Sequence, residues 1–266
     1  MAQLQVTRAA GRVQRQPLLQ IGARVGYAVS GVLHLLIGWL ALQVAWSASG
    51  RSADQSGALQ ALTGNELGRL TLWVAVVGFL ALGSWQLANT VASRPPRGSS
   101  TTSFRTKGIA KTILYLALAW ASLSTARGHP GSSTAQSADF TATLLQHTGG
   151  RLVVAGIGLA VVGAGLYHVF KGWTKKFLRD LNRRPGRLAT RAGVIGYIAK
   201  GVALGVVGAL FVSGAAQNSA VQATGLDGAL RALCEQPRGP WLLTAVALGI
   251  AAYGVYSFAR AKHARV

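Results

Sequence analysis

The stretch LVVAGIGLAVVGAGLYHVF, from Leu152 to Phe170, decides the fold class, because it holds 19 residues without a Lys, Arg, Asp or Glu. A bilayer core needs an apolar helix of roughly 20 residues. Five further runs have a comparable length and composition. The six predicted spans are Val25 to Ala45, Leu70 to Asn89, Ile109 to Ala126, Leu152 to Phe170, Ala192 to Ala215 and Trp241 to Ala259. We therefore predict an all-α, polytopic membrane protein with six transmembrane helices.

The composition excludes several classes of soluble protein. Half of the 266 residues are hydrophobic and only 12% are charged, which is atypical of a water-soluble domain. Cys234 is the one cysteine in the sequence, so an internal disulfide and a cysteine-rich metal site are excluded. The sequence also contains no phosphate-binding glycine loop, nucleophile elbow or zinc-protease motif. We expect no metal, no cofactor and no enzyme activity.

Positive charge is distributed unevenly between the two ends of the predicted spans. The net charge is +21, from 27 Lys and Arg against six Asp and Glu. Twenty of the basic residues flank one set of span ends, which gives that side +19; the other side has +1, and Lys200 inside the fifth span accounts for the remaining charge. Basic residues accumulate on the cytoplasmic side of a membrane. We therefore predict a protein of the bacterial inner membrane with both termini in the cytoplasm, and we do not expect a nucleic-acid partner.

The chain repeats itself at a period of roughly 85 residues. The first span opens with GYAVSG (26–31), the fifth with GYIAKG (196–201) and the third with the looser GIAKT (108–112). Two spans return the chain to the side on which it began. We therefore predict three parallel two-helix repeats around a pseudo-threefold axis.

The repeats and the basic segments together define seven regions. They are a basic cytoplasmic N-terminus (1–24), repeat 1 (25–91), a cytoplasmic linker (92–107), repeat 2 (108–171), a basic juxtamembrane amphipathic segment (172–191), repeat 3 (192–259) and a basic cytoplasmic tail (260–266). Small residues allow helix backbones to approach in lipid. We favour helix packing over a role in a pore for two sets of glycines. Gly83, Gly165 and Gly254 recur in the even spans, and Gly201, Gly205 and Gly208 form a stripe on the fifth span.

These motifs resemble those of the domain-of-unknown-function 1206 family, bacterial membrane proteins in which a two-helix unit occurs three times. The likeness rests on the GYxxxG openings and on three further stretches, DQSGALQAL (54–62), DGALRAL (227–233) and ALGIAAYGVY (247–256). It covers about residues 24–260 and is weakest in the middle repeat. The resemblance implies a fold and a membrane location but no established activity.

Polar residues inside the even spans are the first functional candidates, since such residues are costly in a bilayer. Gln86, His168 and Ser257 each follow an aromatic residue at equivalent positions. They would form a polar ring if the three hairpins surround one axis. His34 lies near mid-membrane. It could be a structural histidine that bonds to a backbone carbonyl, or it could belong to a proton or ligand site.

Four residues of the odd spans form a second candidate group at similar depth, namely Tyr27, Tyr197, Lys111 and Lys200. A lysine there could attract an anionic group. We expect instead that both lysines reach the lipid phosphates at the interface.

Acidic residues recur in the outer loops, beside short Ala- and Leu-rich segments. Asp54, Asp139 and Asp227 occupy these places. We expect each to cap a short interfacial helix, with cation binding as the alternative.

The segment from Lys171 to Arg191 carries eight basic residues. Trp173, Phe177 and Leu181 are four residues apart, which predicts a helix with one apolar face on the inner leaflet. Anionic lipid is the expected partner of its basic residues, and an acidic protein fits equally. The residues expected to contact lipid are Lys175, Lys176, Arg179, Arg183 and Arg184.

Two functions remain open on these observations. The first is a transporter or channel for a small solute or ion. We expect it to be passive, because the spans lack the acidic residues that commonly couple transport to protons or sodium ions. The second is a membrane scaffold or accessory subunit that packs against partner helices. We prefer transport, because repeats with a polar layer often surround a pathway.

Overall fold

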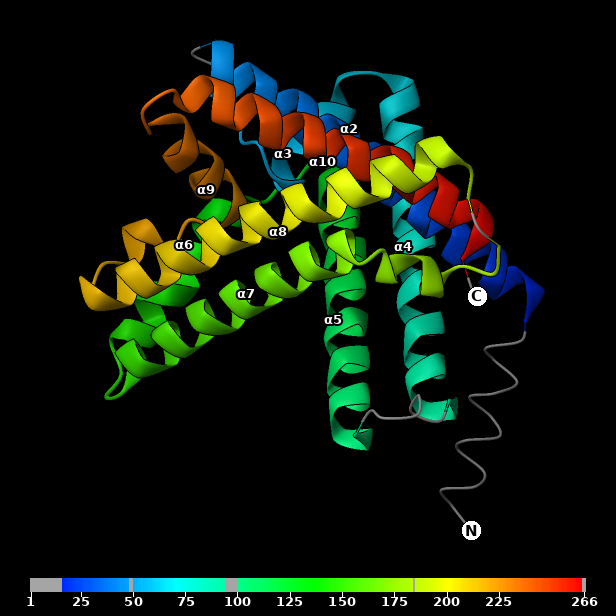
Figure 1. Cartoon of the computed structure of the whole chain (residues 1–266), viewed down its shortest axis with the longest axis horizontal. Coiled ribbons are helices and arrows are strands. Elements are labelled where there is room, and N and C mark those ends of the chain that lie inside the picture. Colours follow the sequence, from blue (N-terminus) through cyan, green and yellow to red (C-terminus); the bar gives the residue numbers. More distant parts are fainter. Residues whose placement is uncertain (1–15, 48–49, 94–99, 184, 265–266) are drawn as a thin grey trace. The chain divides into compact units, whose positions relative to one another are not determined.

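The structure is a computed structural model that describes residues 16–47, 50–93, 100–183 and 185–264. These residues form α-helices and short 3-10 helices (Figure 1). The long helices are α2 (Pro17–Trp46), α4 (Glu66–Ala92), α5 (Thr101–Ala126), α7 (Gly150–Trp173), α8 (Arg187–Ala216) and α10 (Gly239–His263). Each contains one predicted span, and each is long and apolar enough to cross a membrane. The prediction of a multi-pass membrane protein is confirmed at this level.

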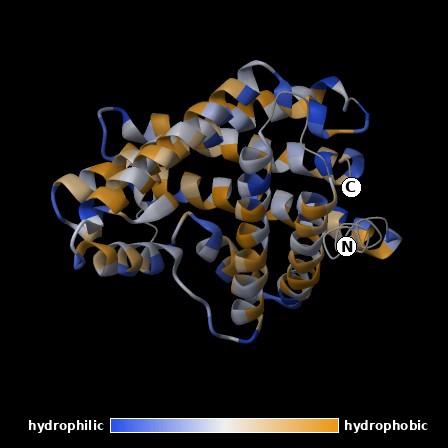
Figure 2. Ribbon diagram, turned by 90° about the horizontal axis from the view of Figure 1, so that it is seen from below, coloured by the Kyte–Doolittle hydropathy of each residue, from blue (hydrophilic) through white to orange (hydrophobic). Residues whose placement is uncertain are grey.

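The outer surfaces of the long helices are apolar. On α7, Leu152, Leu159, Leu166 and Trp173 are seven residues apart and each exposes more than 60% of its surface. Residues at this spacing share one face of a helix. Hydrophobic residues extend along the long helices, and hydrophilic residues gather at helix ends and in connections (Figure 2). Such surfaces suit contact with lipid chains.

The chain forms two compact units. Of the described residues, the first comprises 16–30, 62–93, 100–130 and 257–264, and the second comprises 31–47, 50–61, 131–183 and 185–256. Repeat 2 is divided between them, because α5 packs on α4 in the first unit whereas α7 packs on α8 in the second. The second pair runs side by side in green and yellow (Figure 1).

Glycines bring α7 and α8 into backbone contact within the second unit. A Cβ atom added to Gly165 would lie 2.7 Å from the carbonyl oxygen of Gly201 and 2.8 Å from the nitrogen of Gly205. One added to Gly158 would lie 2.8 Å from the carbonyl oxygen of Gly208. Real Cβ atoms do not approach backbone atoms this closely. Only glycine fits at these positions, as expected for helices packed in lipid.

The contact between α10 and α2 uses the equivalent positions of the repeat. A Cβ atom on Gly254 would lie 2.8 Å from the carbonyl oxygen of Gly31, and one on Gly38 would lie 2.8 Å from that of Ala247. The repeat aligns Gly254 with Gly165, and Gly31 with Gly201. Two interfaces between successive repeats are therefore built in the same way.

The contact between α4 and α5 in the first unit departs from that pattern. Gly83 faces the side chain of Leu116 rather than a backbone. Ile113 and Trp120 stand where the other odd spans carry glycine, and both are exposed. The pairs of facing glycines that bring backbones together in the second unit are therefore not repeated at this contact.

Three short helices form an outer layer in the second unit: α3 (Gln55–Ala61), α6 (Ser133–Leu145) and α9 (Gly225–Cys234). The Ala53 amide before α3 donates to Asp227 Oδ1 on α9 at 2.7 Å. The Ser133 amide on α6 donates to Ser56 Oγ on α3 at 3.2 Å. These bonds tie the three outer loops to one another.

The acidic residues of this layer differ in role. Asp54 caps α3, since its Oδ1 accepts from the Gly57 amide at 2.9 Å, so the capping prediction is confirmed there. The capping prediction is wrong for Asp139, which is an exposed residue in the middle of α6. The N-terminal cap of that helix is Ser132. The prediction is also wrong for Asp227, which lies inside α9 and pairs with Arg231 at 3.0 Å. Both helices begin before these carboxylates, which places them beyond the capping position.

Candidate functional site

A cationic group lies beside a histidine and a tyrosine inside the second unit. Lys200 Nζ on α8 is 3.3 Å from His34 Nε2 on α2 and 4.6 Å from the centroid of the Tyr253 ring on α10. The rings of His34 and Tyr253 are 4.7 Å apart. An ammonium only donates hydrogen bonds, so Nε2 accepts and the neutral imidazole carries its proton on Nδ1. We call these three residues the His34–Lys200 cluster.

The cluster lies deep within the spans. Lys200 and His34 are near the middle of two 30-residue helices. At a rise of about 1.5 Å per residue, Lys200 is roughly 12 Å from Ala192, where the predicted span begins. The expectation that Lys200 reaches the lipid phosphates is corrected here, because its ammonium is held by His34 and Tyr253.

Those two contacts explain how a lysine is tolerated at this depth. A charged side chain at the centre of a span costs about 2.5–3.5 kcal/mol on insertion scales. A hydrogen bond to a charged group contributes about 1.5–3 kcal/mol. A cation over a tyrosine ring contributes about 0.5–2 kcal/mol more. The cluster thus offsets the cost of burial, and the local charge stays positive.

Aromatic rings extend the cluster toward α7. The Tyr253 ring contacts that of Tyr197 at 5.2 Å, and Tyr197 stacks on His168 at 5.8 Å. Tyr197 is 3% exposed. Four of the predicted residues, His34, His168, Tyr197 and Lys200, are therefore joined through neighbouring rings.

Glycines on α8 make room for this packing. A Cβ atom on Gly196 would lie 2.6 Å from the Tyr253 backbone nitrogen, and one on Gly193 would lie 2.6 Å from the Phe177 ring. Phe177 is fully buried, and its ring stacks on Tyr197 at 5.1 Å. The absence of side chains on one face of α8 lets α10 and the segment after α7 close around Tyr197.

Sequence reasoning missed Tyr253 as a member of the site. A signal was available, because the cluster occupies positions where the repeats differ. Repeat alignment pairs Tyr253 with Leu82 and Ala164, and Lys200 with Ser30 and Thr112. His34, Lys200 and Tyr253 lie on three different helices, and each departs from the repeat pattern. These three residues meet at one place.

The other predicted polar residues belong to the first unit. The Arg260 guanidinium lies 4.2 Å from the centre of the Tyr27 ring. Gln86 is 7% exposed and donates to Thr90 Oγ1 at 3.3 Å. Ser257 is buried, and Lys111 is exposed on α5. The ring of Gln86, His168 and Ser257 stays a prediction.

The basic segment after α7 does not form the expected helix. α7 ends at Trp173, Lys175 has a positive φ of 54°, and the 3-10 helix η2 (Lys176–Asp180) follows. Phe177 and Leu181 are buried, whereas Trp173 is 78% exposed. The break at Lys175 turns these apolar residues in different directions, which corrects the prediction of one apolar helix face.

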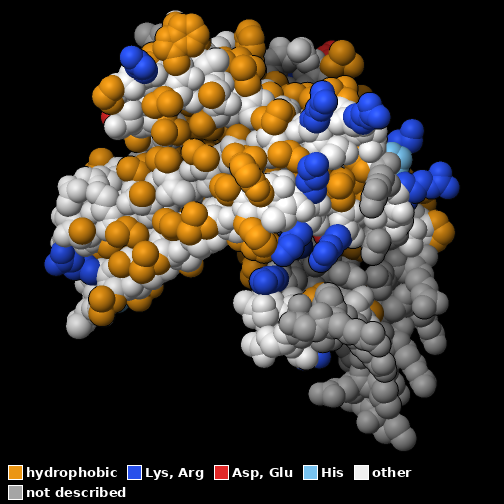
Figure 3. All heavy atoms as spheres, viewed as in Figure 1, with side chains coloured by type: hydrophobic (Ala, Val, Ile, Leu, Met, Phe, Trp, Pro, Cys, Tyr) orange, Lys and Arg blue, Asp and Glu red, His pale blue; other side chains and the backbone are white. Residues whose placement is uncertain are grey.

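Basic side chains of this segment lie at the protein surface. Lys175, Arg179 and Arg183 are exposed, and Lys176 Nζ lies 4.2 Å from the centre of the Phe170 ring. Arg184 lies outside the described residues. Lys and Arg side chains gather near the end of α7 and η2 (Figure 3). An ion pair of 2.6 Å between Lys171 and Asp180 holds η2 against α7.

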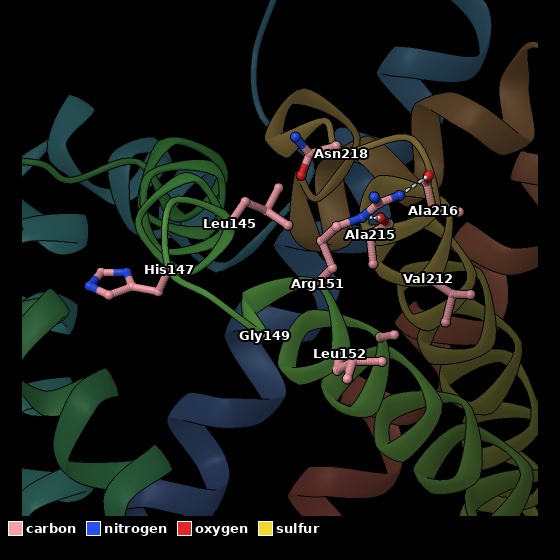
Figure 4. A pocket seen from close by; sticks show the side chains of 10 residues that line it. Leu145, His147, Gly149, Arg151, Leu152, Val212, Ala215, Ala216 and Asn218 are labelled. Carbon is pink, nitrogen blue, oxygen red and sulfur yellow. Dashed lines mark hydrogen bonds between the residues drawn. The ribbon is translucent and has the colours of Figure 1, made fainter.

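An open pocket of about 730 Å³ lies between the start of α7 and the end of α8. Arg151 crosses it and donates to the carbonyl oxygens of Ala215 at 3.1 Å and Ala216 at 2.8 Å (Figure 4). His147 points away from the pocket (Figure 4). The guanidinium thus caps the carboxyl end of α8, and the remaining lining is mainly apolar.

Comparison with known proteins gives the same three repeats. The sequence model of the Domain of Unknown Function (DUF1206) family matches residues 25–93, 106–175 and 195–264. The chain belongs to this family. An uncharacterised protein of Bacillus subtilis (strain 168), YxxB, is 26% identical over 251 residues, covering 92% of this chain and 90% of the relative. No solved structure matches. The DUF1206 chain is therefore a membrane protein with internal repeats.

Proposed function

We propose that this protein is a passive transporter or channel for a small solute or ion, rather than an enzyme. The observation that carries the proposal is the His34–Lys200 cluster at mid-span, where a purely structural bundle would place apolar side chains. Ionisable residues at this depth mark substrate or ion pathways in membrane proteins. The spans carry no acidic residue, so we propose passive movement rather than coupling through a buried carboxylate.

We further propose that the repeats surround a pseudo-threefold axis. Gly165 with Gly201, and Gly254 with Gly31, form equivalent contacts between successive repeats. The bonds that join α3 to α6 and to α9 support the same cyclic order in the outer loops. The charge asymmetry of the sequence supports an inner-membrane protein with cytoplasmic termini.

Anionic lipid is the proposed partner of the inner surface. Each basic residue near an anionic membrane contributes about 1 kcal/mol. Lys175, Arg179 and Arg183 are exposed close to Trp173, an aromatic residue of the kind found at membrane interfaces. Native mass spectrometry should show retained anionic lipid, and the triple change of these three residues to Gln should reduce it.

A swelling assay tests the proposed transport. Proteoliposomes of the full chain are shifted into iso-osmotic glycerol, urea, potassium chloride or potassium nitrate, with valinomycin added to the salt samples so that K⁺ balances anion entry, and light scattering is followed. We expect at least one solute to enter faster than into empty liposomes. We also expect Lys200→Met to alter that rate and Lys111→Met, at an exposed position on α5, to leave it unchanged. Equal rates with and without protein for all four solutes would overturn transport.

A membrane scaffold is the second candidate function, and a groove on the first unit supports it. The first unit carries an apolar groove of about 560 Å³ between α2 and α4, lined by Leu18, Ile21, Val25, Trp73, Val74 and Val77 together with Gly22. An exposed apolar groove beside a small residue suits a further transmembrane helix. Failure of the swelling assay would make this groove the place to search for a partner.

A further inference from the structure

The charge around Lys200 is not balanced by an acid. Within the described part of the chain, Lys200 contacts a neutral imidazole and a tyrosine ring and forms no ion pair. The ion pairs found in this part are Lys171–Asp180 and Arg231–Asp227, both outside the middle of the spans. The predicted spans contain no Asp or Glu. The cluster therefore carries a net positive charge in a low-dielectric setting.

The hydrogen bond to His34 uses one of the donors of the Lys200 ammonium. An ammonium carries three N–H donors, of which one is directed to His34 Nε2. The face of the Tyr253 ring lies toward the cation, and a ring face attracts cations and repels anions. An anion would therefore approach Lys200 from the side away from that face.

We infer that the transported species is a small anion and that Lys200 is its binding residue, with His34 and Tyr253 positioning the ammonium. This inference rests on the proposed transport function. A cation is repelled by the fixed charge of Lys200, and a neutral solute leaves that charge unpaired at mid-membrane. An anion is the class of solute that this cluster stabilises, because charges attract more strongly in a low dielectric.

Flux selectivity gives the first test. Proteoliposomes containing the full chain are exposed to potassium nitrate, potassium chloride and glycerol, with valinomycin present to carry K⁺ so that anion entry is balanced in charge, and nitrate entry is compared between variants. We expect the wild type to pass nitrate or chloride in preference to glycerol, and to show little salt entry when valinomycin is left out. Lys200→Gln should reduce anion entry by about tenfold or more, the effect of losing one charge-assisted hydrogen bond. Lys200→Arg should retain most of the entry, and Lys111→Gln should behave as the wild type.

Binding without flux gives an independent test. The thermal unfolding of the purified chain in detergent is measured in sodium nitrate and in sodium gluconate at equal ionic strength. Nitrate should raise the midpoint for the wild type and Lys111→Gln but not for Lys200→Gln. Circular dichroism and gel filtration check that each variant is folded. If Lys200→Gln fails to fold, the wild-type selectivity and the Lys200→Arg comparison decide the question.

The two readouts separate the two proposals. Entry of glycerol without anion preference, together with equal unfolding midpoints in nitrate and gluconate, would overturn the anion site and leave transport standing. Stabilisation by nitrate that depends on Lys200, without entry of any solute, would overturn transport and leave an anion-binding site. A nitrate effect that survives Lys200→Gln would reflect the general positive charge of the chain, and it would also overturn the inference.

Discussion

Replacing Gly165 by Ala tests whether α7 and α8 are held by backbone contact. The new methyl group would lie 2.7 Å from the Gly201 carbonyl oxygen and 2.8 Å from the Gly205 nitrogen. Both neighbours are backbone atoms that cannot rotate away, so the helices have to separate. Overpacking of this kind costs about 1–3 kcal/mol. At Gly163, two residues earlier on the same helix, nothing lies within 4 Å of such a Cβ atom. There Ala should instead stabilise the helix by about 0.5–1 kcal/mol.

The two variants should therefore move in opposite directions, with a difference of about 1.5–4 kcal/mol. Unfolding of the purified protein by a denaturing detergent, followed by circular dichroism, measures the free energy of each variant against the wild type. Equal stability of Gly165→Ala and Gly163→Ala, or a more stable Gly165→Ala, would refute close packing of α7 on α8.

Further predictions concern the turn after α7 and the outer layer. Phe177→Ala should cost about 3–5 kcal/mol because the ring is fully buried against Tyr197, whereas Trp173→Ala, at a 78% exposed position, should change the free energy of unfolding little in the same assay. Asp227→Ala should cost about 2–3 kcal/mol, because it leaves the Ala53 amide and Arg231 without their carboxylate, and Asp139→Ala at an exposed position is its control. Ser132→Ala should destabilise α6 by about 1 kcal/mol through loss of its N-terminal cap, and hydrogen exchange at the Ala135 amide should rise.

The repeat pattern predicted which residues pack, and the structure places them in contact. Gly165 was singled out by its recurrence and Gly201 and Gly205 by their stripe on the fifth span, and they meet where α7 approaches α8. Their partners could not be read from the period alone. Repeat 2 shows this, since Gly108 at the start of α5 lies against Thr90 of α4 in the first unit.

Parts of the candidate site were predictable as residue types but not as an arrangement. His34 and Lys200 stood out because ionisable residues are rare in apolar spans. Their pairing joins residues 166 positions apart, and no local pattern encodes that distance. Phe177 was assigned to a lipid-facing helix because its spacing of four fits a helix, but the left-handed backbone at Lys175 ends that periodicity.

The amino-acid sequence by itself determined the membrane location, the six spans and the threefold repetition. These properties follow from runs of apolar residues and from their period, which act locally along the chain. The tertiary structure decided that Lys200 meets His34 and Tyr253, that α7 packs on α8, and that Asp227 joins two outer loops. The direction of each side chain around a helix and the choice of its neighbour arise from packing between distant segments, which local composition does not specify.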